Sequence, residues 1–248
     1  MIQSFVIAQE IHHYWTAFVR LIYPEVCLLC SGSLEIQDCY ICGPCIHKIE
    51  TLKPPLCPKC AMQIPPYLSK MSRCPSCQNM KTHFDRGYAL FPYQNEIKKI
   101  LHSVKFSKKS WHLKALDPFL NDLTMPPIFD YDFLVPVPLD PIRKRQREFN
   151  QSHLIARLIH QHDNSSPIRS VLKKVKRTEP QSALDRSRRL ENLGNAFKLR
   201  RGSKVSGKKI LLIDDIVTTG ATVNECAKCL KEKGALKVDF FALARTIF

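Results

Sequence analysis

The chain has 248 residues, of which 44% are apolar and 24% are charged, and its formal net charge is +16 at pH 7. This length suits one medium-sized domain together with a smaller one, and the apolar content is sufficient for a hydrophobic core. Because no run approaches about 18 apolar residues and the opening segment lacks the features of a secretory signal, we expect a cytoplasmic protein with no membrane insertion.

The first 25 residues contain apolar side chains at helical spacing. They are Ile11, Trp15, Phe18, Val19 and Ile22. Such spacing is typical of an amphipathic helix. We therefore predict a helix that docks its apolar face on the body of the protein, rather than a membrane anchor.

The chain contains eleven cysteines, nine of them before residue 80, and eight of these nine form four Cys-x-x-Cys pairs. The pairs are Cys27/Cys30, Cys42/Cys45, Cys57/Cys60 and Cys74/Cys77. Each pair can present two thiolates to one tetrahedral zinc ion, and two pairs complete a site. Disulfides are the alternative, which the missing secretory signal disfavours. The pattern predicts two structural zinc ribbons with four cysteine ligands each.

The cysteine pattern leaves the pairing around each zinc open. Sharing of a zinc by neighbouring pairs is the simplest arrangement, but crossed sharing also satisfies the spacing. Cys39 forms a further Cys-x-x-Cys pair with Cys42 and is interpreted as a spare thiol. Cys226 and Cys229 lie on the apolar face of a predicted helix, where we expect small buried hydrophobic residues rather than metal ligands.

Strands alternate with helices after residue 80. Predicted strands cover residues 86–93, 131–139, 167–176, 208–214 and 237–245, and predicted helices cover residues 94–106, 111–120, 150–162 and 220–235. The polar segment 180–197 is predicted to be a mobile excursion. This alternation indicates an α/β fold with a mainly parallel sheet and helices on both faces. We therefore expect a module of the N-terminal helix and both ribbons over residues 1–80, and an α/β domain over residues 81–248.

The positive charge is concentrated in residues 143–209. This segment has 19 lysines and arginines against five acids, a net charge of +14. A solvated basic face is the default interpretation of such a segment. A block this dense favours a polyanionic partner, which is either a nucleic-acid backbone or a phosphorylated ligand.

Two acids follow the apolar strand near the end of the chain. Asp214 and Asp215 end the run "KKILLIDD", and residues 218–222 read Thr-Thr-Gly-Ala-Thr before a predicted helix. Free N–H groups at a helix start, with a glycine that permits close approach, suit a phosphate. Carboxylates can accept hydrogen bonds from the vicinal hydroxyls of a sugar or help to hold Mg²⁺. Because Walker A and GxGxxG motifs are absent, the pattern favours a site for a phosphorylated sugar.

The segment "ILLIDDIVTTGAT" resembles the phosphoribosyl pyrophosphate (PRPP) loop of type I phosphoribosyltransferases. The resemblance implies a type I phosphoribosyltransferase fold, here preceded by the double zinc ribbon. It also implies that the two acids contact the ribose hydroxyls, with Mg²⁺ close by, and that the turn wraps the 5′-phosphate. The implied PRPP-binding residues are Asp214, Asp215, Thr218, Thr219, Gly220, Ala221 and Thr222. The candidate cations for the pyrophosphate are Arg143, Arg147, Lys173, Lys174 and Arg177.

Almost the whole chain is similar to the ComF (ComFC or GntX-like) proteins of bacterial natural competence. The similarity includes the cysteine pairs, the PRPP loop, "VPVPLDPIRKRQREFNQS" and "RTEPQSALDRSRRLENLGNAF". The resemblance places the pyrophosphate against the loop between "VPVPL" and "REFNQ". Glu148 departs from the family pattern, which has glycine at this place, and it adds a negative charge beside that loop. The resemblance implies a role in the uptake of single-stranded DNA, with a ComFA-type helicase as the partner.

Two functions fit these observations. The first is a competence protein that binds PRPP with Mg²⁺ and handles single-stranded DNA on its basic surface. Phe149 and Phe197 could stack bases there, although packing in the core is favoured. The alternative is an active phosphoribosyltransferase that moves phosphoribosyl from PRPP to an acceptor and releases pyrophosphate. No catalytic residue is assigned, because no segment specifies an acceptor site.

Overall fold

The computed structural model describes residues 26–34, 40–68, 73–79, 81–106, 109–120, 125–140, 145, 148–176 and 195–247. The chain divides into two compact units, Met1–Ile49 and Glu50–Phe248. The predicted N-terminal helix, Cys39 and most of the predicted excursion over 180–197 lie outside the described residues. Within the described ranges, no helix is both long and apolar enough to cross a membrane.

The described part of the smaller unit is a cysteine-rich ribbon. The Cys27 N–H donates to the Gly32 carbonyl at 2.7 Å, which closes a tight turn around the first Cys-x-x-Cys pair. Helix α2 (Gly43–Ile46) follows directly after Cys42 and carries Cys45. Among the described residues of this unit, tight turns bring the cysteines together, which is typical of small elements that a metal holds together.

A second ribbon with the same local structure opens the larger unit. The Cys57 N–H donates to the Met62 carbonyl at 2.7 Å, and an antiparallel bridge again flanks the turn. The residue after each first pair has a left-handed backbone, with φ of 61° at Ser31 and 56° at Ala61. The two ribbons are therefore an internal structural repeat. The second also contains η1 (Pro66–Leu68) and α3 (Pro75–Asn79).

A four-stranded parallel sheet in the order β1-β6-β5-β2 forms the centre of the larger unit. Its strands are β1 (Gly87–Pro92), β2 (Phe133–Pro136), β5 (Lys209–Val217) and β6 (Lys237–Arg245). The central strands are buried along almost their whole length, which explains their near-continuous apolar sequences. Gly87 lies against the ring of Phe240, so a side chain at this position would collide with it. The predicted mainly parallel α/β fold is confirmed.

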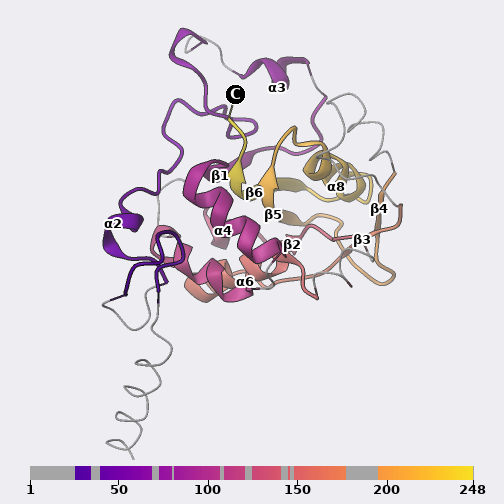
Figure 1. The fold of residues 1–248 in the computed structure, drawn as a ribbon. Helices are drawn as coiled ribbons and strands as arrows, with labels where there is room; N and C mark the ends of the chain where they lie inside the picture. The colour runs from indigo at the N-terminus through magenta and orange to yellow at the C-terminus, as the bar shows by residue number, and fades with distance from the viewer. Residues whose placement is uncertain are drawn as a thin grey trace, which may run out of the picture. The chain divides into compact units, whose positions relative to one another are not determined.

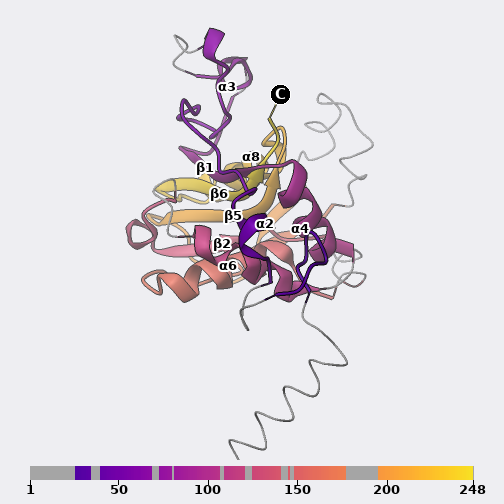
Figure 2. The same cartoon turned by 60° about the vertical axis from the view of Figure 1, so that its left-hand side comes forward.

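Helices cover both faces of the sheet, with α4 (Asn95–Phe106) and α6 (Gln151–His162) on one face and α8 (Ala221–Lys231) on the other (Figures 1 and 2). Because side chains alternate along a strand, α8 packs with every second residue of β5, including Leu212. Cys226 is completely buried in this cluster, as expected for a small hydrophobic residue.

The predicted helix over 111–120 is a 3₁₀ helix, η2 (Ser110–Phe119), and a second short one, η3 (Ile128–Asp130), precedes β2. Pro118 lies inside η2 and has no N–H to donate, which is one reason why regular α-helical hydrogen bonding does not continue. The apolar side chains of η2 are nevertheless buried, as the sequence pattern requires.

Strands β3 (Leu172–Lys174) and β4 (Phe197–Leu199) pair antiparallel in a separate two-stranded sheet, which we call the β3–β4 ribbon. The strand predicted over 167–176 is therefore much shorter than expected. Its first part makes only an isolated bridge, between Ile168 and Leu134, before the chain leaves β2. Phe197 begins β4 instead of ending an excursion, and its ring is buried in the core, where it packs rather than stacks on a base.

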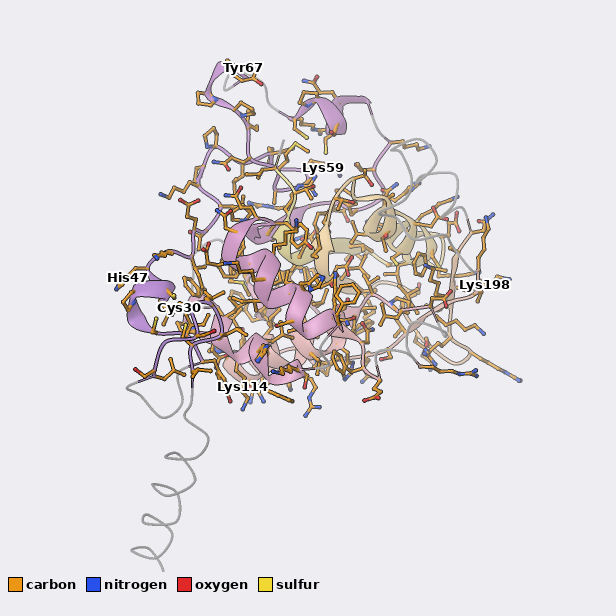
Figure 3. All side chains as sticks on the ribbon, in the orientation of Figure 1. Cys30, His47, Lys59, Tyr67, Lys114 and Lys198 are labelled. Atoms are coloured by element: carbon orange, nitrogen blue, oxygen red, sulfur yellow. The ribbon has the colours of Figure 1, made fainter. Side chains whose placement is uncertain are left out.

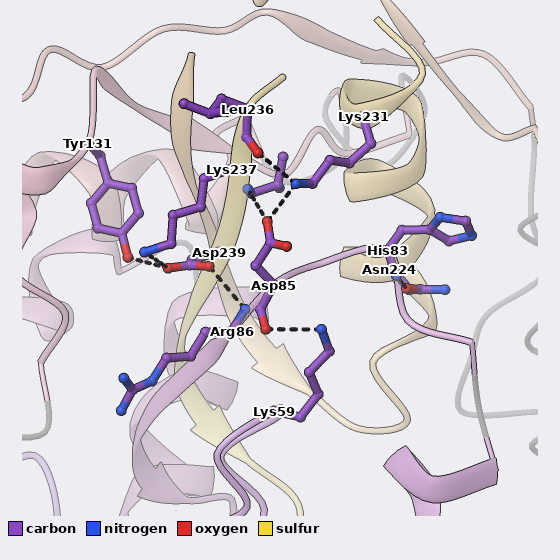
Figure 4. Close-up of polar contacts among 11 residues, drawn as sticks. Lys59, His83, Asp85, Arg86, Tyr131, Asn224, Lys231, Leu236, Lys237 and Asp239 are labelled. Atoms are coloured by element: carbon purple, nitrogen blue, oxygen red, sulfur yellow. Dashed lines mark hydrogen bonds and ion pairs between the residues drawn. The ribbon is translucent and has the colours of Figure 1, made fainter. Parts of the chain in front are cut away.

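Polar contacts hold the segment between the second ribbon and β1 (Figure 4). Lys59 of the ribbon donates to the Asp85 carbonyl at 3.0 Å, and the Asp85 carboxylate pairs with Lys231 of α8 at 2.7 Å. The Arg86 N–H donates at 3.0 Å to Asp239, which is fully buried. These contacts explain why the second ribbon belongs to the larger compact unit. The predicted domain boundary after residue 80 stays a prediction.

Candidate functional site

The acid pair lies at the carboxyl end of β5, the edge where parallel sheets bind ligands. Asp214 is only 8% exposed, and its Oδ1 accepts hydrogen bonds from the Ser152 hydroxyl at 3.1 Å and from the Asp215 N–H at 3.0 Å. Ser152 is in the first turn of α6, so this helix orients the buried carboxylate. Ser152 was not among the predicted site residues, because nothing local to residue 152 shows that α6 begins beside β5.

Burial raises the pKa of the Asp214 carboxyl to about 7, and the neighbouring Asp215 charge acts in the same direction. The hydrogen bonds from the Asp215 N–H and from Ser152, together with the Lys105 ammonium, oppose this shift. A carboxyl with a pKa near neutrality changes its charge in the physiological range. The charge of Asp214 therefore depends on pH around pH 7.

Asp215 forms an ion pair with Lys105, whose Nζ lies 2.6 Å from Oδ2. Only 18% of the lysine side chain and 14% of the aspartate side chain are exposed, so water screens this pair weakly. Lys105 was not among the residues predicted for the site. Its position four residues after the inward-facing Leu101 on α4 indicates that it lies on the inward face of the helix, since residues so spaced share a face, but it does not indicate a contact with Asp215.

The turn after the acid pair leads directly into α8. Gly220 is the residue before the helix and has φ of 81°, a left-handed conformation that glycine adopts without steric cost. The Ala221 N–H is 3.4 Å from the Thr219 hydroxyl, a long contact that an anion could replace. Thr218, Thr219 and Thr222 are half-buried. All seven residues of the predicted PRPP loop thus lie at the β5–α8 junction, with helix N–H groups on one side and carboxylates on the other.

The loop between β2 and α6 reaches the same edge of the sheet. Asn150 connects its two ends, since its amide donates to the Val137 carbonyl at 2.9 Å and its oxygen caps α6 through the Ser152 N–H at 3.1 Å. Glu148 has φ of 68°, a left-handed conformation that explains why the family pattern favours glycine here. The pyrophosphate candidates Arg143 and Arg147 lie outside the described residues.

The remaining cation candidates belong to the β3–β4 ribbon. Lys173 is exposed, and Lys174 lies over the ring of Phe197, 5.8 Å from its centroid. The Asn195 N–H, just before β4, donates to Glu225 of α8 at 2.8 Å. This end of the β3–β4 ribbon therefore lies beside α8, the helix that begins after the threonine-rich turn. Arg177 lies outside the described residues. The assignment of these cations to pyrophosphate stays a prediction.

The eight paired cysteines form two groups of four, Cys27/Cys30/Cys42/Cys45 and Cys57/Cys60/Cys74/Cys77, and the sulfurs of each group all lie within 4.8 Å of one another. Neighbouring pairs therefore share a group, and crossed sharing is excluded. The Cys30–Cys42 and Cys60–Cys74 sulfur distances are 3.7 and 3.5 Å. Tetrahedral zinc with ligands at about 2.3 Å requires sulfurs about 3.8 Å apart, so both groups fit this ion.

Local contacts separate the pKa values of the thiols within each group, because they lower the pKa of some thiols, such as Cys27 and Cys57, and raise that of others, such as Cys45 and Cys77. Burial raises the pKa of the Cys27 thiol, but N–H donors, foremost that of Cys42, outweigh it and bring the pKa to about 6. In the second group, contacts with the other three thiols, that of Cys60 first, hold the pKa of Cys57 far below its usual range. Thiolates are the form that binds zinc.

Arg245 gives an independent test of whether a metal fits the second group. Its side chain is 1% exposed, and Nη2 donates to the Cys60 sulfur at 3.3 Å. Its buried Nε and Nη1 have no hydrogen-bond acceptor within the described part of the chain. A buried cation requires a counter-charge, and zinc with four thiolate ligands carries a net negative charge. The residues therefore fit zinc, and the arginine would balance its charge.

The same arginine connects this group to the candidate PRPP site. Arg245 ends β6 and pairs with Val217, the residue before the threonine-rich turn, and the next N–H, of Thr246, donates to the Val217 carbonyl at 3.2 Å. The second cysteine group thus supports the end of the strand from which the turn begins.

Comparison with known proteins gives the family. The Phosphoribosyl transferase domain matches residues 137–246, and the Double zinc ribbon domain matches residues 18–79. The DNA utilization protein YhgH of Escherichia coli K12 is 30% identical over 237 residues, which cover 92% of this chain and 100% of that protein. The chain belongs to the ComF family of the phosphoribosyltransferase superfamily. This ComF-family chain therefore has the type I phosphoribosyltransferase fold behind a double zinc ribbon.

Other relatives of this ComF-family chain match it with similar coverage. Competence protein F of Haemophilus influenzae is 26% identical over 230 residues, which cover 88% of this chain and 96% of the relative. Competence protein ComFC of Bacillus subtilis is 28% identical over 244 residues, which cover 91% of this chain and 97% of the relative. A solved purine phosphoribosyltransferase from Pyrococcus horikoshii covers 56% of this chain and 82% of its own at 14% identity, with a TM-score of 0.30 that adds no weight.

Proposed function

We propose that this ComF-family chain binds PRPP together with Mg²⁺ at the junction of β5 and α8. The observation that carries the proposal is the placement of two carboxylates beside the amino end of a helix. Asp214 and Asp215 accept hydrogen bonds from the vicinal ribose hydroxyls, while the N–H groups and hydroxyls of residues 218–222 hold the 5′-phosphate. The match of the Phosphoribosyl transferase domain to residues 137–246 supports this assignment.

Magnesium fits the same junction. It prefers oxygen ligands and is commonly held by one or two carboxylates together with substrate phosphates. When bound, it neutralises charge on the pyrophosphate. Lys105 contributes a cation from the protein side, because its ammonium already compensates Asp215 at 2.6 Å. This leaves the buried Asp214 as the group whose charge depends on pH.

The raised pKa of Asp214 gives the proposed site a direction of pH dependence. Below its pKa of about 7 the carboxyl is neutral and is a poorer acceptor for ribose hydroxyls and a poorer ligand for Mg²⁺. Above that pH the Asp214 carboxylate is ionised. The affinity for PRPP with Mg²⁺ therefore rises from pH 6 to pH 8.

We also propose that the chain handles incoming single-stranded DNA in the cytoplasm during natural transformation. Two relatives are named competence proteins and a third is named a DNA utilization protein, which supports this role. The net charge of +14 over residues 143–209 supplies the electrostatic attraction that backbone binding requires. A ComFA-type helicase is the partner that the family resemblance implies.

Isothermal titration of PRPP with Mg²⁺ tests the site. Wild type should bind, and Asp214→Asn/Asp215→Asn should weaken binding at least tenfold. A matched control is Glu50→Gln/Glu232→Gln, which removes the same number of negative charges from exposed positions. Equal affinity of the acid-pair variant and the control variant would show that the carboxylates do not contact the ligand.

An active phosphoribosyltransferase is the alternative, and pyrophosphate release separates it from binding alone. Zinc-loaded protein is incubated with PRPP, Mg²⁺ and a panel of bases, with and without single-stranded DNA. Release above the rate of the Asp214→Asn/Asp215→Asn variant would show transfer or hydrolysis. Release at the rate of that variant, together with PRPP binding, would show a site that holds the ligand without reaction.

A further inference from the structure

A cavity of about 640 Å³ lies at the amino end of the sheet, and we call it the basic pocket. Its walls come from the start of β2, the segment before β3, the turn after β4 and the residue before β5. Its lining includes Asp132, Phe133, Arg169, Arg201, Lys204 and Lys208. The volume is within the range of about 300–1,000 Å³ that is typical of ligand sites.

The basic pocket has an excess of uncompensated positive charge. Lys208 pairs with Asp132 at 2.8 Å. Arg169, Arg201 and Lys204 are exposed and have no carboxylate within ion-pair distance among the residues that the structure describes. Four cations thus face one acid, and three of the cations are available to a ligand. Such a concentration of one sign of charge in a concave surface attracts anions.

The backbone holds the walls of the basic pocket in place. The Arg169 N–H donates to the Leu134 carbonyl of β2 at 2.8 Å, and the Arg200 N–H donates to the Val171 carbonyl at 2.8 Å. Gly202 forms the turn after β4 with φ of 80°. Arg169 lies over the ring of Phe133, with its guanidinium 5.9 Å from the centroid. The cations therefore stand on a fixed frame rather than on a free loop.

The basic pocket is distinct from the proposed PRPP site. Lys208 precedes β5 and Thr218 follows it, and β5 has nine residues. At about 3.3 Å per residue, the strand separates the two sites by about 30 Å. A ligand in the basic pocket and PRPP at the other end of the strand can therefore bind at the same time.

The surroundings of the basic pocket favour a long polyanion over a single phosphate. The β3–β4 ribbon starts at the pocket and carries exposed lysines on both strands, Lys173 and Lys198, the second at the outer edge of the molecule in Figure 3. Several cations spaced along a surface can contact successive phosphates of a nucleic-acid backbone. Phe133, the aromatic residue of the pocket, is only 5% exposed and lies beneath Arg169, so base stacking does not contribute there.

We propose that the basic pocket, together with the exposed Lys198 of the β3–β4 ribbon, binds the phosphate backbone of single-stranded DNA, while Lys173 remains a candidate for the PRPP site. This inference rests on the proposed DNA-handling function and gives it a location. Binding is electrostatic and independent of base sequence, and it does not compete with PRPP, because the two sites lie at opposite edges of the sheet.

Fluorescence anisotropy with labelled oligothymidylate tests the location. The pocket variant is Arg201→Gln/Lys204→Gln, which changes two exposed side chains. The control variant is Lys98→Gln/Lys99→Gln, which removes the same charge from exposed positions on α4. The pocket variant should bind at least tenfold more weakly, whereas the control variant should stay within about twofold of wild type. Because each lost phosphate contact reduces the salt slope by about 0.7, the slope should fall by about 1.4.

The outcomes separate the inference from the function on which it rests. If wild type binds the oligonucleotide and the pocket and control variants bind it equally well, the proposed location of the DNA site is wrong, while the DNA-handling function stands. Wild type that does not bind the oligonucleotide would overturn both. Saturating PRPP with Mg²⁺ should leave the anisotropy unchanged, and displacement of the oligonucleotide would contradict separate sites. Calorimetry should show unchanged PRPP affinity in the pocket variant.

Discussion

Replacement of Asp214 by asparagine should stabilise the protein, and increasingly so as the pH rises. The folded-state pKa of about 7 lies above the ordinary value of 3.8, so the folded protein binds the proton more tightly than the unfolded chain. The favourable contribution of this group is complete below about pH 4 and is lost as the pH rises through the folded-state pKa. An asparagine side chain at this position has no charge to bury, and its amide oxygen can still accept from the Asp215 N–H.

The size of the effect follows from the shift. A shift of about three pKa units corresponds to a cost on the order of 4 kcal/mol above pH 7, more than half of which develops between pH 5 and pH 8. For a protein of this size, about 1 kcal/mol moves the unfolding midpoint by about 2–4 °C. The midpoint of Asp214→Asn minus that of wild type should therefore grow by about 5–10 °C over this range.

Thermal unfolding of zinc-loaded protein without PRPP measures this difference at pH 5, 6, 7 and 8. Each comparison of variant and wild type is made at one pH, so the contributions of other titrating groups to the unfolding midpoint cancel. Asp215→Asn is the control, because it removes the neighbouring charge that raises the pKa of Asp214 and should flatten the pH dependence. A difference between Asp214→Asn and wild type that is the same at every pH would refute the reasoning, since it would mean that Asp214 stays ionised throughout.

Three further variants test other parts of the account. Lys105→Met removes the cation that favours the ionised form of Asp214. The pH at which protein stability changes through titration of Asp214 should therefore move above pH 7 in this variant. An unchanged value would show that the ion pair does not influence Asp214. Glu148→Gly relieves a left-handed backbone conformation that costs about 1 kcal/mol, so the free energy of unfolding should rise by a similar amount. Glu148→Ala should not raise it. Urea unfolding of the two variants measures the difference. Arg245→Met leaves the second cysteine group without its buried counter-charge, so a chelator should release one of two zinc ions at least tenfold faster than in wild type. Equal release of both ions from this variant would show that Arg245 does not stabilise the metal.

The parts of the molecule that depend on local patterns were predictable. The cysteine spacing predicted two four-cysteine groups, and the apolar run before Asp214 predicted the buried strand β5. The apolar periodicity of residues 94–106 and 150–162 predicted α4 and α6 within one residue at each end. In each case the signal and the structure that it specifies occupy the same short segment.

The contacts that complete the site were not predictable in this way. Lys105 and Ser152 reach the acid pair from α4 and α6, which are far from it in sequence, and a single sequence carries no measure of such distances. Arg245 reads as the polar end of a strand, although its side chain is buried against Cys60. The strand predicted over 167–176 contains β3, but β4 and its pairing with β3 were missed, because β4 has only three residues.

The central claim is that the acid pair and the threonine-rich turn form a PRPP site, and calorimetric titration of PRPP into the zinc-loaded protein tests it most directly. We predict binding that requires Mg²⁺, strengthens from pH 6 to pH 8 as Asp214 ionises, and falls at least tenfold in Asp214→Asn/Asp215→Asn. Absence of heat from wild type at pH 8 with Mg²⁺ would contradict it, as would binding that the double variant retains.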